Sequence, residues 1–178
     1  TKRENHIQEF LLNSNHKTSL FRKNDLTFGS EFLYRNVDLL NENRVNDEER
    51  ILTESLQGLN IVLYSTFNSS LFKNNSIDVG LRYNYFQSLG ISRLEPRINL
   101  NQKISKRWII NTSFEKKSQT IFKINETIQN TNSRSNNLWT LAGNELYPLL
   151  KSTQYSLGFT RKGERTIFDL DFYSRQIG

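Results

Sequence analysis

The sequence predicts an all-β fold, an antiparallel up-and-down meander of about eight strands. The first observation is the alternation of apolar and polar residues over most of the chain, the pattern of strands with one apolar face. The second is the high frequency of Asn, as in "SNHKT", "KNNS" and "NTNSRSNN", because Asn favours turns. The third is that only 35% of the 178 residues are hydrophobic, so no thick apolar core is expected.

The predicted strands follow one another from the N-terminus to the C-terminus. The alternation is cleanest in "SIDVGLRYNYF", where apolar and aromatic residues take the odd positions 77–85 and polar residues or Gly take the even positions 78–84. The misfit is Pro96, because proline removes a donor from the hydrogen-bond ladder of a strand. In order, strands are expected within residues 6–21 and at 26–34, 59–67, 77–85, 94–100, 108–114, 155–159 and 168–172.

The links between these strands alternate in length. Short links are expected at 22–25, 69–75, 105–107 and 162–165, and longer or more variable ones at 39–50, 88–91 and 119–151, although 88–91 has only four residues. Tight turns at one end and longer loops at the other are typical of bacterial outer-membrane barrels. The sequence therefore favours part of a transmembrane outer-membrane β-barrel over a soluble β-sandwich, which has no reason to separate its links in this way.

The apolar rows of the predicted strands are expected to face lipid. Aromatic residues would form two interfacial girdles, one at the outer rim and one near the tight turns. Aromatics at strand ends also pack soluble cores, and the charges opposite the apolar rows suit a lumen or an exposed sheet face equally. The girdle candidates are Tyr34, Tyr83 and Tyr85 at the rim and Phe67 and Trp108 near the turns; the lipid-facing candidates are Ile77, Val79, Leu81, Leu94, Ile98 and Leu100.

Composition and charge favour neither nucleic-acid binding nor catalysis. The net charge is +6, but Lys and Arg are spread along the sequence without a basic run, so nucleic acid is not an expected partner. Asp169 and Asp171 share one strand face without a His or an activated nucleophile beside them. The chain has no Cys, and its two histidines lie in polar surroundings, so no catalytic, metal or cofactor site is predicted.

Two stretches carry a family resemblance. "GLRYNYF", followed by "LEPRINLNQKISKRWIINTSFEKKSQ", resembles the barrel of TonB-dependent outer-membrane receptors, in which a GxR strand leads into an EPR strand and a tight turn. "LWTLAGNELYPLLKSTQYSLGFTRKGERTIFDLDFYSRQIG" looks like a later strand pair of the same family, especially in Bacteroidetes-type bacteria, whose Asn-, Lys- and Ile-rich composition is similar. The resemblance covers residues 20–178.

The resemblance implies a larger receptor. Such a receptor has an N-terminal plug domain inside the barrel and a segment that contacts the TonB complex; neither is visible in this sequence, which also lacks Met, so residues 1–178 are expected to be a single barrel segment of a longer polypeptide. The implied location is the bacterial outer membrane. The implied partners are membrane lipid, the plug domain of the same polypeptide, TonB and a ligand.

Two sets of candidate binding residues follow from this reading. Residues facing the lumen and the plug would be Arg82, Arg93, Glu95, Arg97 and Asn99. In the longest link, Trp139 and Tyr147 would contact ligand in an extracellular loop.

The expected function is active uptake of a scarce ligand, without an enzymatic step. The ligand stays open among siderophores, cobalamin, glycans and peptides. Two other classes remain: a self-contained small outer-membrane barrel acting as an adhesin or anchor, and a soluble β-sandwich that binds carbohydrate.

Overall fold

The computed structural model describes residues 2–21, 24–45, 48–72, 74–127, 135–143 and 147–178. Its strands are β1 (Lys2–Phe21), β2 (Asn24–Val45), β3 (Glu48–Phe72), β4 (Asn75–Phe86), β5 (Ile91–Lys103), β6 (Trp108–Gln119), β7 (Ile121–Thr127), β8 (Ser135–Leu141), β9 (Leu150–Lys162) and β10 (Ile167–Ile177), with a short 3-10 helix, η1, at Gln87–Leu89. Among the described residues, no helix has the length and apolar character needed to cross a membrane.

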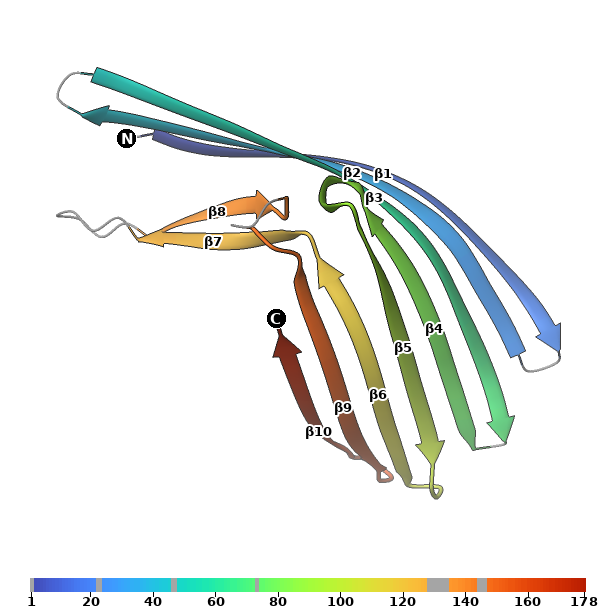
Figure 1. Cartoon of the computed structure of the whole chain (residues 1–178). Coiled ribbons are helices and arrows are strands. Elements are labelled where there is room, and N and C mark those ends of the chain that lie inside the picture. Colours follow the sequence, from blue (N-terminus) through green and yellow to red (C-terminus); the bar gives the residue numbers. More distant parts are fainter. Residues whose placement is uncertain (1, 22–23, 46–47, 73, 128–134, 144–146) are drawn as a thin grey trace.

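One bent sheet dominates the structure (Figure 1). It has eight strands in the order β1-β2-β3-β4-β5-β6-β9-β10, and every neighbouring pair is antiparallel. In the sequence, β7 and β8 come between β6 and β9, and they form a separate two-stranded sheet. They lie beneath the arch of β1, β2 and β3. The predicted all-β meander of eight strands is confirmed.

The predicted link at residues 39–50 is wrong. β2 continues to Val45 and β3 begins at Glu48, so pairing runs through most of this polar stretch. Two paired strands satisfy each other's backbone groups, and the ladder therefore persists where the apolar alternation fades. For the same reason Tyr34 does not end its strand, because β2 continues well beyond it.

The ladder between β4 and β5 pairs residues of like character. Val79 of β4 lies opposite Ile98 of β5, and Tyr83 of β4 lies opposite Leu94 of β5. Arg82 lies opposite Glu95 in the alternate row. Since directly opposed residues share a face, one face of the sheet is apolar and the other is polar.

The apolar face, here called the outer face, is exposed. Leu94 is 59% exposed and Leu81 is 48% exposed. The same face carries large exposed side chains on the other strands, namely Phe10, Leu12, Phe28, Phe32, Leu63, Tyr155, Leu157, Leu170 and Phe172. So large an apolar surface marks an interaction with another apolar phase or layer.

The opposite face, here called the inner face, carries the β7-β8 hairpin. At one end of the sheet Phe86, Ala142 and Leu149 are buried together, with Phe122 and Ile91 packed against them. This small cluster supplies the apolar contact between the hairpin and the sheet. Val37 and Val62, both fully buried, also belong to the inner rows of β2 and β3.

Pro96 fits into β5 because of where the next ladder begins. β5 pairs with β4 along its whole length, but its pairing with β6 starts only at Arg97. Pro96 therefore lies just beyond the end of the β5-β6 ladder, where a missing backbone donor costs little.

Adjacent positions on β5 test the assignment of the two faces. Ile98 lies on the outer face between Val79 and Phe114, and Asn99 lies on the inner face between Asp78 and Ser113. With the expected outer-membrane location, Ile98→Arg in the full-length protein would put a charge against lipid, and we expect it to destabilise the folded barrel by about 2–4 kcal/mol. The measurement is the fraction of heat-modifiable, folded barrel in isolated membranes. Asn99→Arg is the matched control, because its new charge faces Asp78; equal losses in both variants would contradict the assignment.

Candidate functional site

A polar hollow on the inner face is the candidate site. It has a volume of about 630 Å³ and lies over β2 to β6. Four of the five predicted lumen residues line it, Arg82, Glu95, Arg97 and Asn99. Arg93 belongs to the same row of β5, opposite Asn84, but is not part of the lining.

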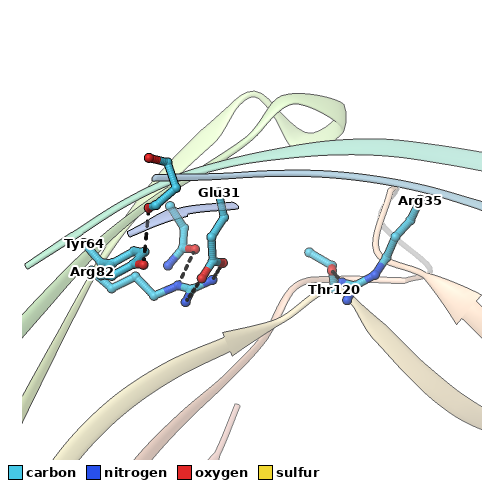
Figure 2. Close-up of polar contacts among 7 residues, drawn as sticks. Glu31, Arg35, Tyr64, Arg82 and Thr120 are labelled. Atoms are coloured by element: carbon cyan, nitrogen blue, oxygen red, sulfur yellow. Dashed lines mark hydrogen bonds and ion pairs between the residues drawn. The ribbon is translucent and has the colours of Figure 1, made fainter. Parts of the chain in front are cut away.

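Arg82 is held by an ion pair that the sequence analysis missed. Its guanidinium binds Glu31 of β2, with Nη2 2.6 Å from Oε2 and Nη1 3.4 Å from Oε1. Its Nε donates to Oδ1 of Asn84 over 3.2 Å. Figure 2 shows the two side chains reaching toward each other from strands separated by β3. The sequence does contain one indication of this pairing. Glu31 alternates with the apolar residues Phe28, Phe32 and Tyr34, which places it on the polar face of its strand.

Glu95 and Arg93 differ from Arg82 because each has a buried polar atom without a hydrogen-bond partner among the described residues. Glu95 is 8% exposed, and although it lies opposite Arg82, its Oε1 has no hydrogen-bond partner among the described residues. Nε of Arg93 and Nδ2 of Asn84 are also buried without a partner in that part of the chain. Buried polar atoms of this kind cost free energy until a partner satisfies them, so the inner face is prepared to receive polar groups.

Two glycines of the inner face lie against large polar side chains of the neighbouring strands. A Cβ on Gly80 would lie 3.6 Å from Nε of Arg97, which faces it across the β4-β5 ladder. A Cβ on Gly29 would lie 2.5 Å from the hydroxyl oxygen of Tyr64, its partner across β2 and β3. Tyr64 thus lies against Gly29, and its hydroxyl donates to the carbonyl oxygen of Ser14 over 3.5 Å; Tyr64 is labelled in Figure 2. Gly29 therefore needs a residue without a side chain, whereas the distance at Gly80 is an ordinary van der Waals contact.

The link with the two predicted ligand-contact residues is anchored to the first two strands. The Asn5 side chain holds the backbone of Trp139 at both groups, donating to its carbonyl oxygen over 3.3 Å and accepting from its amide over 3.0 Å. Arg35 donates from Nη1 to Oγ1 of Thr120 over 3.0 Å, and its Nε lies 2.6 Å from Oε2 of Glu9. Figure 2 shows the contact between Arg35 and Thr120.

Trp139 and Tyr147 contact different neighbours within this link. Nζ of Lys123 lies 5.7 Å from the centre of the Trp139 ring, which is 38% exposed. Tyr147 is half-buried, with its ring 6.4 Å from that of Phe122. Of the two aromatic residues, Trp139 is therefore the more exposed.

Metal-binding clusters were sought among the side chains of the described segments. No group of three or more His, Cys, Asp or Glu residues there could hold a metal ion. Asp169 and Asp171 are exposed on β10, opposite Thr160 and Gly158 of β9.

Comparisons with known proteins find similarity in structure and not in sequence. No protein-family model and no curated protein matches the chain. A mutant of the ferric enterobactin receptor PfeA of Pseudomonas aeruginosa matches 96% of this chain with a TM-score of 0.72 and 14% identity. The siderophore receptor PirA of Acinetobacter baumannii matches 98% with a TM-score of 0.67 and 14% identity. The RagAB peptide transporter matches 98% with a TM-score of 0.60 and 16% identity.

The extent of these matches defines what they show. The chain spans 27% of the length of the PfeA and PirA chains and 24% of the matched RagAB chain. All three are named as receptors or transporters, and none is named as an enzyme. The resemblance that the sequence suggested is confirmed for the fold: the eight-stranded antiparallel meander matches part of the barrel of TonB-dependent receptors.

Proposed function

We propose that residues 1–178 form one wall segment of an energy-coupled receptor in the bacterial outer membrane, which binds a scarce ligand outside the cell and imports it. The plug domain and the segment that contacts TonB would lie elsewhere in the same polypeptide. The proton-motive force, delivered through TonB, would move the plug, and no step is enzymatic. The wall segment supplies the lipid-facing surface, the plug-facing surface and an external loop.

The observation that carries this proposal is the opposite character of the two sheet faces. The outer face exposes an apolar surface with no second layer of the described chain against it, and the inner face gathers charges and buried polar atoms without partners. Lipid covers the first without hydrogen bonds, and a polar domain satisfies the second. β1, β2 and β3, with 20, 22 and 25 residues, are longer than the roughly 9–11 residues that cross a bilayer and would extend beyond it.

The two other classes fit the structure less well. A β-sandwich buries its apolar face against a second sheet, but the second sheet here, β7 and β8, packs on the polar side. A self-contained small barrel pairs its first and last strands. In the described sheet, β1 and β10 are the two free edges, which suits a segment continued by further strands.

The proposed plug contact lies at the hollow. Arg97 is exposed there, and Arg82 and Glu95 stand opposite each other beside it. Carboxylate and carbonyl groups of a plug would accept charge-assisted hydrogen bonds from the arginines. Asn99 and Arg93 complete the row on β5 that faces the same domain.

The proposed ligand contact lies on the link between β6 and β9, through Trp139 and Tyr147. Siderophores and peptides are the first ligand classes to test, because the matched structures are named for them. Cobalamin and glycans stay open for this chain. A gene for a surface lipoprotein beside that of the receptor would favour a peptide or a glycan.

Loss of the Arg97 side chain tests the plug contact. In the full-length receptor we expect Arg97→Ala to loosen the plug, because each hydrogen bond to a charged group contributes about 1.5–3 kcal/mol. The readouts are higher ion conductance in planar bilayers and faster entry of a large antibiotic, with ligand binding at the loops retained. Arg175→Ala is the control, since Arg175 shares the inner face but lies on β10, outside the hollow. Wild-type conductance and transport in Arg97→Ala would mean that these charges only line water.

Protease treatment of intact cells tests the external position of the link. We expect cleavage within residues 119–151 before the rest of the eight-stranded sheet is cut, and faster cleavage in Asn5→Ala, which loses both hydrogen bonds to the Trp139 backbone. Asn13→Ala is the matched control, because Asn13 is on the same face of β1 and opposite Glu31. Cleavage confined to the β3-β4 turn would reverse the proposed topology.

A further inference from the structure

Two tight turns at one end of the sheet lie side by side. β5 and β6 are joined by residues 104–107, and β9 and β10 by residues 163–166. Because β6 and β9 are neighbours, these turns meet, and the amide of Lys162 donates to the carbonyl oxygen of Arg107 over 2.7 Å. Figure 1 shows both turns at the lower end of the sheet, away from the β7-β8 hairpin.

The two turns bring together a basic cluster that does not appear as a run in the sequence. The cluster consists of Lys103, Lys106, Arg107, Arg161, Lys162 and Arg165, with Glu164 as the one acidic residue within residues 103–108 and 161–165. All six side chains are exposed, and within the described chain none of them forms an ion pair. The expectation that Lys and Arg do not cluster is therefore wrong for this end of the sheet.

The β5-β6 turn is fixed before any ligand binds. Oγ of Ser105 accepts hydrogen bonds from the amides of Arg107 and Trp108, both over 3.2 Å. The amides of Ile104 and Ser105 donate to the carbonyl oxygen of Trp108 over 3.0 Å and 3.3 Å. A turn held in this way presents Lys106 and Arg107 at little conformational cost.

Apolar residues around the cluster place it at the boundary of an apolar phase. Trp108 lies on the outer face, 44% exposed, and the guanidinium of Arg161 lies 5.7 Å from the centre of its ring. Ile104, Ile167 and Phe168 are each at least 58% exposed at the same end. Trp beside Arg and Lys, directly below an apolar band, is the arrangement that anchors proteins at the level of lipid headgroups.

We propose that this basic cluster binds the phosphate headgroups of anionic phospholipids in the leaflet at the tight-turn end of the barrel. The inference rests on the membrane location given under the proposed function. Guanidinium and ammonium groups donate to phosphate oxygens, and the attraction of several cations to an anionic surface adds up. Lys106, Arg107 and Arg165 lie in the turns and Arg161 lies in the outer row, whereas Lys103 and Lys162 belong to the inner rows. Trp108 and Ile104 then enter the acyl boundary beside the bound headgroup.

Lipid binding to the purified full-length receptor tests the inference. The probes are phosphatidylglycerol and phosphatidylcholine, titrated into the receptor in neutral detergent and counted by native mass spectrometry. We expect wild type to prefer phosphatidylglycerol. The double variant Lys106→Gln, Arg161→Gln should weaken that binding by roughly tenfold or more, because each cation near an anionic surface contributes about 1 kcal/mol; Arg161 lies in the outer row beside Trp108.

A matched double variant separates a site from a general charge effect. Lys123→Gln with Lys151→Gln also removes two exposed cations, but at the hairpin end of the sheet, and should leave phosphatidylglycerol binding unchanged. Equal losses in both doubles, or no loss in the first, would overturn the proposed site. A receptor that stays in solution without detergent would instead contradict the membrane location. Heat-modifiable migration checks that each variant is folded.

Discussion

The continuous antiparallel ladder from β1 to β10 is the constraint on which the rest of the structure depends. Directly opposed residues in such a ladder must share a face, so the registers of the seven successive pairs together fix the faces of all eight strands. The partners Val79 and Ile98 lie in one row, and Arg82 and Glu95 lie in the next. A slip of one residue anywhere would mix apolar and charged side chains on both surfaces, and the strong separation of the two faces therefore stabilises a single register.

The strands and their faces could be predicted because period-two alternation is a local property of the sequence. That Leu81, Tyr83, Leu94 and Pro96 share one face follows from parity, but which of them are directly opposed does not, because the link between β4 and β5 is not one of the predicted tight turns. The extension of β2 and β3 could not be predicted, since strand pairing supplies its stability where the apolar pattern ends. Arg82 pairs with Glu31, which is 51 positions away in the sequence and lies across an intervening strand. Arg82 does so although Glu95 is directly opposite it, and which of the two carboxylates it binds depends on how far the side chains extend. The basic cluster was missed because it is assembled from two turns far apart in the chain.

The inner face combines groups that are satisfied within the segment and groups that are not. Arg82 and Arg35 each have a carboxylate partner, at Glu31 and Glu9, and these pairs tie β4 and β1 to β2. Glu95 has a buried oxygen without a partner in the described chain, and Asn60 has another on the same face. The first kind of group orders the sheet, and the second leaves hydrogen-bonding capacity on the inner face that the described residues do not use.

The way in which the β7-β8 excursion leaves the sheet has a consequence for evolution. The main sheet is interrupted at Gln119 and resumes at Leu150, and these two residues face each other in the ladder of β6 and β9. The excursion therefore begins and ends at one rung, and its length does not enter the register of any strand. Residues between these points can be inserted, deleted or exchanged at a loop-closure cost that grows only slowly with length. Related chains could therefore differ in this excursion while keeping the ladder of the main sheet unchanged.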